Sequence, residues 1–175
     1  MDKLLEYFLL EPEREFHVRE LAKYFKKAPT TVSKYLNQYK KKNLLVSKKK
    51  FNHLLFKANT NNPLYKDIKL AYNIKQLRES GLIEFLEDQY NHPETIVLFG
   101  SFRKGENTPN SDIDILIIST IKKEVELNIF EKRLKVSIQL FVHSKADIEN
   151  MKIHNKELLN NLINGISLVG YWEVF

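Results

Sequence analysis

The stretch IVLFGSFRKGENTPNSDIDILII, residues 96–118, constrains the fold of this chain more than any other part of its sequence. Two apolar runs, 96–99 and 115–118, enclose a polar loop rich in glycine, proline and asparagine. Short apolar runs bounded by turn residues predict buried strands. We therefore expect two neighbouring strands joined by this loop, with any chemistry placed where the loop meets them.

Two aspartates, Asp112 and Asp114, stand one residue apart where the second run begins. Side chains alternate along a strand, so both carboxylates point to one face while Ile113 and Ile115 point into the core. Two carboxylates at the rim of a buried strand are costly unless a cation sits between them. Mg²⁺ with a nucleoside triphosphate (NTP) fits, because carboxylates and phosphate oxygens share that ion, and Gly100 lets the backbone approach a phosphate.

The same stretch resembles the nucleotidyltransferase superfamily, whose signature is an apolar strand, Gly-Ser, a short loop and Asp-x-Asp on the next strand. Here these elements read Gly100-Ser101 and Ser111-Asp112-Ile113-Asp114, and the chain is most similar to the small, minimal nucleotidyltransferases. The resemblance implies a mixed sheet flanked by helices, with Asp112 and Asp114 as metal ligands and catalytic residues. It also implies nucleotide contacts from Gly100, Ser101, Lys104 and Ser111.

The third carboxylate that this superfamily uses is missing from the expected strand, residues 135–142. Gln139 stands where that acid would fall, and the next carboxylate, Asp147, has the position of a helix cap. An amide oxygen can coordinate a metal but cannot accept the proton of an attacking hydroxyl. Nucleotide binding is therefore expected to survive better than transfer chemistry.

Positive charge is concentrated in the first third of the chain. The formal net charge is +6, yet residues 1–60 carry a balance of +8 and residues 61–175 a balance of −2. From Leu21 to Lys66 there are twelve lysines, no arginine and no carboxylate. Such a segment is either a solvated basic face or a surface for a polyanion, and the complete absence of acids favours the polyanion.

The pattern within this basic region predicts a helix over 16–25, a break, a second helix over 30–42, and strands over 44–50 and 53–58. In this order the segment resembles the winged helix-turn-helix of small transcription regulators. Lys26 stands where a turn glycine is common, and Asn43 stands where glycine usually ends the recognition helix. Asparagine tolerates the left-handed conformation that such an end requires.

The resemblance implies that double-stranded DNA contacts the second helix and the lysine-rich turn between the strands. With Val32, Leu36 and Tyr39 facing inward, the opposite helix face offers polar side chains for base edges and phosphates. Six to eight phosphate contacts would give a log–log salt slope on the order of −5 to −7. The candidate DNA-binding residues are Thr30, Thr31, Lys34, Asn37, Gln38, Lys48, Lys49 and Lys50.

The expected organisation is α+β, with a winged helix over 1–60, a helical linker over 61–91 and a nucleotidyltransferase-like domain over 92–175. The linker helix, 64–90, has a break at Ser80-Gly81, and it could join the domains or pair with its twin in a homodimer. Further helices are expected over 122–134, 144–152 and 154–164, and a closing strand or tail over 165–175. No apolar run is long enough to span a bilayer and there is no cysteine, so we expect a cytoplasmic protein without membrane contact.

Two functional interpretations follow from the residues. In the first, a DNA-binding regulator carries a domain that binds Mg²⁺-NTP with little or no chemistry. In the second, an active nucleotidyltransferase uses Asp112 and Asp114 to transfer a nucleotide to a hydroxyl acceptor. The resemblance to minimal nucleotidyltransferases also leaves open an antitoxin-type role with a separate helical partner protein.

Overall fold

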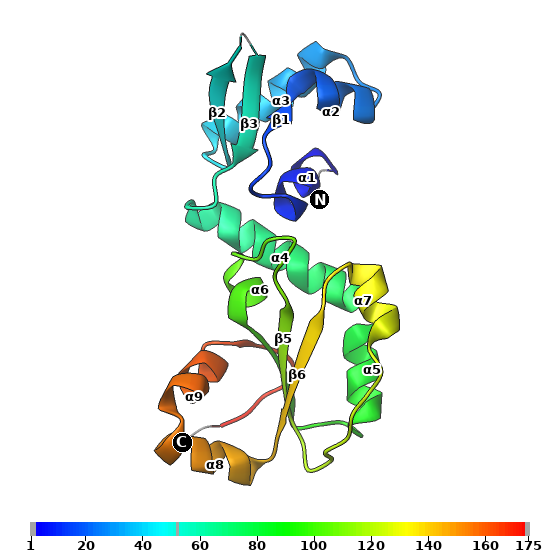
Figure 1. Ribbon diagram of the computed structural model, residues 1–175, viewed down its shortest axis with the longest axis vertical. Helices are drawn as coiled ribbons and strands as arrows, with labels where there is room; N and C mark the ends of the chain where they lie inside the picture. Colours follow the sequence, from blue (N-terminus) through cyan, green and yellow to red (C-terminus); the bar gives the residue numbers. More distant parts are fainter. Residues whose placement is uncertain (1–2, 52, 174–175) are drawn as a thin grey trace. The chain divides into compact units, whose positions relative to one another are not determined.

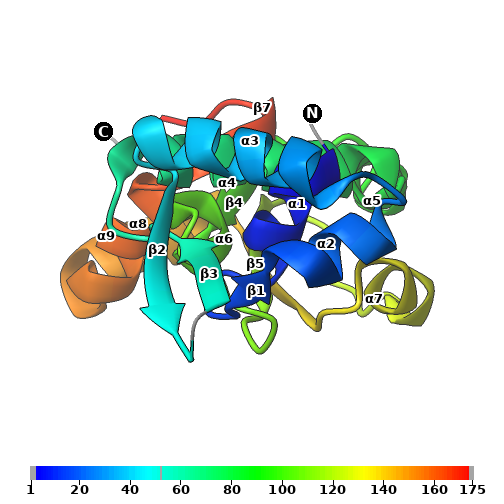
Figure 2. The ribbon, with the colours of Figure 1, turned by 90° about the horizontal axis from the view of Figure 1, so that it is seen from above.

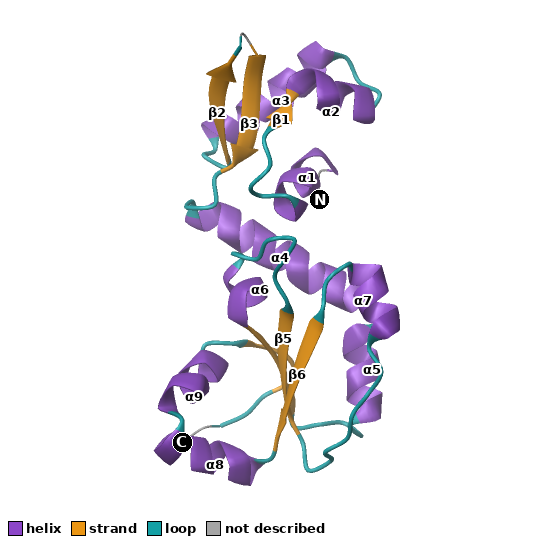
Figure 3. Ribbon diagram, viewed as in Figure 1, coloured by secondary structure: helices purple, strands orange, loops and turns teal. Residues whose placement is uncertain are grey.

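The computed structural model describes residues 3–51 and 53–173 of the chain. The chain forms two compact units, Met1–Lys69 and Leu70–Phe175, and the boundary falls within one helix, α4. Both units combine helices with a sheet, which confirms the predicted α+β class (Figure 3).

The first unit packs helices against a three-stranded antiparallel sheet of order β1-β3-β2 (Figure 2). Its elements are α1 (Lys3–Leu10), β1 (Phe16–His17), α2 (Val18–Tyr24), α3 (Pro29–Lys41), β2 (Leu45–Lys50), β3 (His53–Ala58) and the beginning of α4 (Pro63–Glu79). Strands β2 and β3 form a hairpin whose tip points away from the helices of this unit (Figures 1 and 2).

Aromatic side chains form much of the core of the first unit. Phe8, Phe16 and Phe56 are buried, and the rings of Phe8 and Phe16 meet edge to face at 4.9 Å between centroids. The buried hydroxyl of Tyr65 donates a hydrogen bond of 2.7 Å to the backbone oxygen of Phe8. This bond joins the first turn of α4 to α1. It also satisfies the buried hydroxyl, which would be costly to leave unpaired.

The helix predicted over 16–25 begins two residues later, at Val18. Phe16 and His17 instead form strand β1, where they pair with Phe56 and Leu55 of β3. The His17 ring then accepts a hydrogen bond from the amide of Arg19 and caps α2. The prediction failed at this end because the pairing that holds these residues extended is formed with a strand far along the sequence.

The second unit is a four-stranded mixed sheet of order β6-β5-β4-β7, in which β5 and β6 are parallel and the other pairs are antiparallel. Helices cover both faces (Figure 1): α5 and α7 contribute to one apolar core, and α8 and α9 to the other. Its elements after α4 are α5 (Leu82–Gln89), β4 (Thr95–Phe99), α6 (Gly100–Lys104), β5 (Ile113–Ile118), α7 (Asn128–Leu134), β6 (Ile138–His143), α8 (Lys145–His154), α9 (Lys156–Ile163) and β7 (Ile166–Gly170).

Most predicted elements of the second unit are present. The helix predicted over 64–90 breaks where expected, because Gly81 adopts a left-handed conformation with φ of 80° between α4 and α5. The closing strand is confirmed as β7, which pairs with β4. Within the described residues, no helix combines the length and the apolar content needed to cross a membrane.

The helix predicted over 122–134 is wrong in its first half, since α7 begins only at Asn128 and residues 119–127 are irregular (Figure 3). Contacts with α5 and the loop after it hold this segment. The Tyr90 hydroxyl donates to the backbone oxygen of Lys123 at 2.9 Å, and the Lys123 ammonium donates to Gln89 at 2.9 Å. Tertiary contacts thus replace the helix that the local pattern favours.

Lys26 and Asn43 both adopt left-handed backbone conformations, with φ of 53° and 58°. An ordinary L-residue pays roughly 1–2 kcal/mol there, and asparagine pays less. We therefore expect Lys26→Gly to stabilise the first unit by about 1 kcal/mol and Asn43→Gly by a few tenths, measured by amide hydrogen exchange of α2 and α3. Lys26→Ala is the control, because it removes the charge but keeps the strain. Equal changes for Lys26→Ala and Lys26→Gly would contradict the backbone explanation.

Candidate functional site

Strand pairing brings the predicted site residues of the second unit together at one end of its sheet. Asp114, near the start of β5, lies opposite Phe99 at the end of β4 and beside Gln139 at the start of β6. Gly100 follows Phe99 directly, and Asp112 precedes β5. Ile113 and Ile115 are fully buried, which confirms that the two aspartates point away from the core that these isoleucines join.

Gly100 has to be glycine because of Asp114. Its φ is +68°, and a Cβ atom built there would lie 2.0 Å from the Asp114 carboxylate oxygen Oδ2 and 3.0 Å from Cγ. The first distance is shorter than real Cβ contacts allow and the second is unusually tight, so any larger residue would displace the Asp114 carboxylate. The sequence had suggested this glycine for the approach of a phosphate. The structure adds that it admits the carboxylate itself.

Asp114 is partly buried, and burial raises the pKa of its carboxyl above the usual range. The neighbouring charge of Asp112 raises that pKa further. Both causes disfavour the ionised form, because burial removes hydration and like charges repel. A cation between the two aspartates would reverse both effects, so the electrostatics of this pair suit a positively charged ligand.

Gln139 occupies the position predicted from the sequence, next to Asp114 on the neighbouring parallel strand. Its amide nitrogen Nε2 donates a hydrogen bond of 2.7 Å to Oδ2 of Asp112. The side chain therefore shares the face of the two aspartates but contributes a hydrogen-bond donor instead of a third negative charge. It cannot act as a general base at this place.

Asp147, the next carboxylate along the sequence after Gln139, serves a different purpose. It lies in the first turn of α8, beyond the opposite end of β6, and accepts hydrogen bonds from the amide and hydroxyl of Ser144 at 2.7 and 2.8 Å. The pKa of Asp147 lies well below its usual range. The largest cause is its interaction with Lys122, an ion pair of 2.7 Å, and the hydrogen bonds from Ser144 lower the pKa further. The predicted capping role is confirmed.

The loop between Gly100 and Asp112 begins as the short helix α6 and is closed by its own hydrogen bonds. The Glu106 amide donates to the backbone oxygen of Ser101 at 3.0 Å, and the Thr108 amide donates to the Ser111 hydroxyl at 2.9 Å. Lys104, at the end of α6, is exposed to solvent. The nucleotide contacts expected from Ser101, Lys104 and Ser111 stay predictions.

A buried pair of asparagines that sequence reasoning missed supports this loop. The side-chain amide of Asn73, on α4, donates to the backbone oxygen of Phe102 at 2.8 Å and to Oδ1 of Asn107 at 2.9 Å. Both asparagines are buried. The available signal was a polar residue between Tyr72 and Ile74 in a helix with apolar neighbours, but its partners lie 29 and 34 residues away.

The predicted DNA-binding residues lie in the first unit and are treated by themselves. Helix α3 buries Val32 and Leu36, as expected. The polar residues predicted on its other face are all exposed, as are the three lysines of β2: Thr30, Thr31, Lys34, Asn37, Gln38, Lys48, Lys49 and Lys50. Some of them have contacts within the unit: the Asn37 amide donates to Ser33 at 2.9 Å, Lys48 forms an ion pair with Glu15, and the Lys50 ammonium lies over the ring of the next residue.

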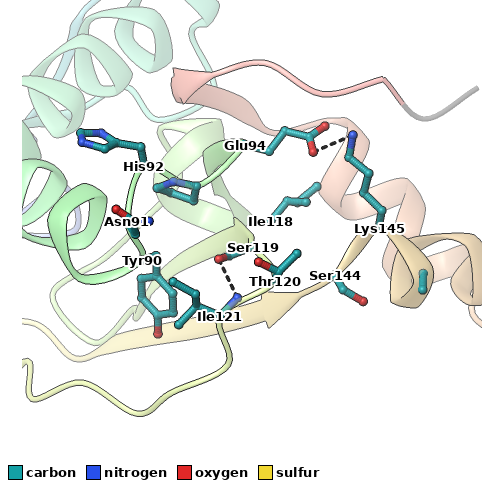
Figure 4. Close-up of a pocket in the computed structure, with 12 residues that line it drawn as sticks. Tyr90, Asn91, His92, Glu94, Ile118, Ser119, Thr120, Ile121, Ser144 and Lys145 are labelled. Carbon is teal, nitrogen blue, oxygen red and sulfur yellow. Dashed lines mark hydrogen bonds and ion pairs between the residues drawn. The ribbon is translucent and has the colours of Figure 1, made fainter.

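A pocket of about 430 Å³ opens at the other end of the second unit's sheet (Figure 4). Its charged groups Glu94 and Lys145 pair with each other at 2.8 Å, and the Ser119 hydroxyl already accepts a hydrogen bond from the Ile121 amide. These groups satisfy one another and leave no net charge for a phosphate or a metal ion. The end of the sheet that holds Asp112 and Asp114 is therefore the candidate functional site.

The sequence model of nucleotidyltransferase domains matches residues 79–168, just over half of the chain. This range includes Gly100, Asp112, Asp114 and Gln139, so the match covers the whole candidate site. Comparisons with curated proteins and with solved structures found no match.

The raised pKa of Asp114 has a consequence for stability. A carboxyl whose pKa is higher in the folded state binds protons preferentially there, so folding is favoured as the pH falls from above that pKa towards about 3.9, the value of a free aspartate. We expect Asp114→Asn to be more stable than the wild type near neutral pH, with a difference that shrinks as the pH falls.

Urea unfolding followed through Trp172 at several pH values tests this expectation, because this single tryptophan packs on the core formed with α8 and α9. Exposed Asp88 on α5 gives the control, Asp88→Asn, which removes a carboxylate without relieving burial. A stability difference that stays constant from about pH 8 to pH 4 would show that the titration of Asp114 is not its source.

Proposed function

Because the chain belongs to the family of nucleotidyltransferase domains, we propose that its second unit binds a nucleoside triphosphate together with Mg²⁺. Asp112 and Asp114 hold the cation, and the backbone at Gly100 and Ser101 accommodates phosphate oxygens. The observation that carries this proposal is a pair of neighbouring carboxylates in which partly buried Asp114 packs against Gly100 and lies beside the charge of Asp112. Bound Mg²⁺ supplies the positive charge that links these carboxylates to a triphosphate.

The side chains around the pair suit one hard cation. Within residues 3–51 and 53–173, no group of three or more histidine, cysteine, aspartate or glutamate side chains is arranged to hold a metal. Two carboxylates with phosphate oxygens and water complete the coordination that Mg²⁺ prefers. A second cation would need further negative charge where Gln139 now donates to Asp112.

Transfer chemistry requires a group that accepts the proton of the attacking hydroxyl. Gln139 stands beside Asp114 and offers no basic atom for that task, and Asp147 is committed to the cap of α8 at the far end of the sheet. We therefore propose that the nucleotide acts as a ligand and that transfer is slow or absent. The retained pair of aspartates favours the second candidate, an active nucleotidyltransferase.

For the first unit, we propose a winged helix that binds double-stranded DNA and makes the whole chain a nucleotide-responsive regulator. Support comes from the order of α2, α3 and the β2–β3 hairpin, from the exposed polar face of α3, and from a segment of twelve lysines without an acid. Lysines contact phosphates, while threonine, asparagine and glutamine can reach base edges. With no arginine between residues 21 and 66, this surface lacks the bidentate reader of guanine.

The nucleotide proposal predicts Mg²⁺-dependent binding of at least one NTP, measured by calorimetric titration with ATP, GTP, CTP and UTP. The double variant Asp112→Ala/Asp114→Ala should weaken that binding by more than about 100-fold, because it removes both cation ligands. Gly100→Ala should weaken it as well, since its Cβ atom displaces Asp114. Wild-type affinity in the double variant would show that the site is assigned wrongly.

Gly81→Ala is the matched control for Gly100→Ala. Gly81 also has a positive φ, of +80°, but nothing lies within 4 Å of the added Cβ. The Gly81→Ala variant should lose about 1 kcal/mol of stability through backbone strain and keep its nucleotide affinity.

Incubation with radiolabelled NTP decides between a nucleotide-binding domain and an active nucleotidyltransferase. Label transferred to nucleic acid or protein would establish an enzyme, and Gln139→Glu tests whether an added carboxylate restores transfer.

The DNA proposal predicts that reversing the hairpin charges weakens duplex binding and flattens its salt dependence. With Lys48→Glu, Lys49→Glu and Lys50→Glu combined, the log–log slope should fall in magnitude by roughly 2 to 3, because up to three phosphate contacts are lost. Fluorescence anisotropy over a salt series measures the slope. Lys132→Glu, an exposed site on α7 of the second unit, is the control, and nucleotide binding should stay unchanged. An unaltered slope would remove the hairpin from the interface.

A further inference from the structure

Phe51 lies in the turn of the β2–β3 hairpin with 86% of its surface exposed. Of the ten phenylalanines that the structure describes, five are buried, among them Phe8, Phe16 and Phe56 in the same unit, and four others are half-buried. Exposing a whole aromatic ring leaves a large apolar surface in water, which favours contact with a partner.

The backbone at this position is also unusual for an aromatic residue. Phe51 adopts a left-handed conformation with φ of 46°. Glycine or asparagine occupies such a position at little cost, whereas a bulky side chain is an outlier there. The turn itself therefore does not explain the phenylalanine, and strained residues of this kind occur where a side chain is held for binding.

The surroundings of the ring are strongly basic. Lys48, Lys49 and Lys50 immediately precede it, and the Lys50 ammonium lies 5.8 Å from the centre of the Phe51 ring. Glu15 forms an ion pair with Lys48, which is the lysine of these three that lies farthest from the tip of the hairpin. An exposed aromatic ring next to three lysines is complementary to a nucleic acid, which has a negatively charged phosphate backbone and bases with apolar faces.

We propose that Phe51 is a wedge that enters the minor groove of DNA and partly unstacks a base step, while the hairpin lysines hold the flanking phosphates. Apolar side chains inserted between base steps kink a duplex, and flexible pyrimidine–purine steps such as TA yield most easily. The DNA contacted by the hairpin is thus selected through its deformability. This inference rests on the proposed DNA binding and adds a specificity that α3, without arginine, does not supply.

The same ring on a bilayer would be a weaker explanation. One aromatic side chain offers little buried area, and stable membrane attachment takes a larger apolar face or a second anchor. The exposed polar residues of α3, in the same unit, have donors and acceptors suited to base edges. A lysine-rich hairpin with one wedge fits a duplex better than a lipid surface.

Full-length protein is titrated at low salt with two duplexes of about two helical turns that contain only A·T pairs. One alternates T and A, so that TA steps recur along it, and the other is a continuous A-tract, which is stiff. 2-Aminopurine replaces one adenine at a TA step and reports unstacking by its fluorescence. The wild type should prefer the alternating duplex by about tenfold and increase the fluorescence.

Phe51→Ala should lose both the preference and the fluorescence change and keep the salt slope, because no charge is removed. Phe51→Leu should keep part of the preference, since leucine is also an apolar wedge. Val46→Ala is the matched control: Val46 is 46% exposed on β2 but lies near the base of the hairpin, so both signals should persist.

DNA binding by the wild type that is identical in Phe51→Ala would overturn the wedge and leave the proposed DNA-binding function intact. Absence of binding to any duplex at low salt would overturn the proposed function and the wedge with it. Phe51-dependent binding to phosphatidylserine vesicles, combined with Phe51-independent DNA binding, would assign the ring to a membrane and also overturn the inference.

Discussion

The close approach of the Asp114 carboxylate to the backbone at the end of β4 is the constraint on which the second unit's site depends. Asp114 fits only because Gly100 has no Cβ atom, and it stands there only because β5 pairs with β4 and β6 in the observed register. Its burial and the charge of Asp112 both disfavour ionisation. A cation bound between these carboxylates would offset this electrostatic cost, so the pair suits a positively charged ligand.

Gln139 changes what such a site can do. A third carboxylate would add repulsion to a pair that already has too much negative charge, whereas the amide donates to Asp112 and orients it at no electrostatic cost. The substitution therefore favours an ordered site in the absence of ligand. An amide in place of a carboxylate at this position also removes the proton acceptor that nucleotidyl transfer needs. The amide of Gln139 therefore orders Asp112 but weakens transfer. Both effects agree with the proposal that this unit binds a nucleotide with little turnover.

Local patterns in the sequence predicted the features that depend on local geometry. Strand alternation placed Asp112 and Asp114 on one face, the break at Gly81 follows from its backbone freedom, and Ser144 with Asp147 forms the cap of α8. Features made by distant partners were missed. Asn73 reaches a loop 34 residues away, strand β1 exists only through its pairing with β3, and residues 119–127 are held open by contacts from the end of α5 and the loop after it. No local pattern encodes such partners.

The proposed ligands of the two units are both polyanions, yet the units would recognise them by opposite means. Residues 1–60 carry a balance of +8 and can meet phosphates directly through lysine, so added divalent cations compete with that binding. Residues 61–175 carry a balance of −2, and the candidate site there presents carboxylates, so a triphosphate reaches it only with a cation in between. Removing Mg²⁺ with a chelator should therefore abolish nucleotide binding and leave or strengthen DNA binding. A chain in which both activities required Mg²⁺ would not follow this division of charge.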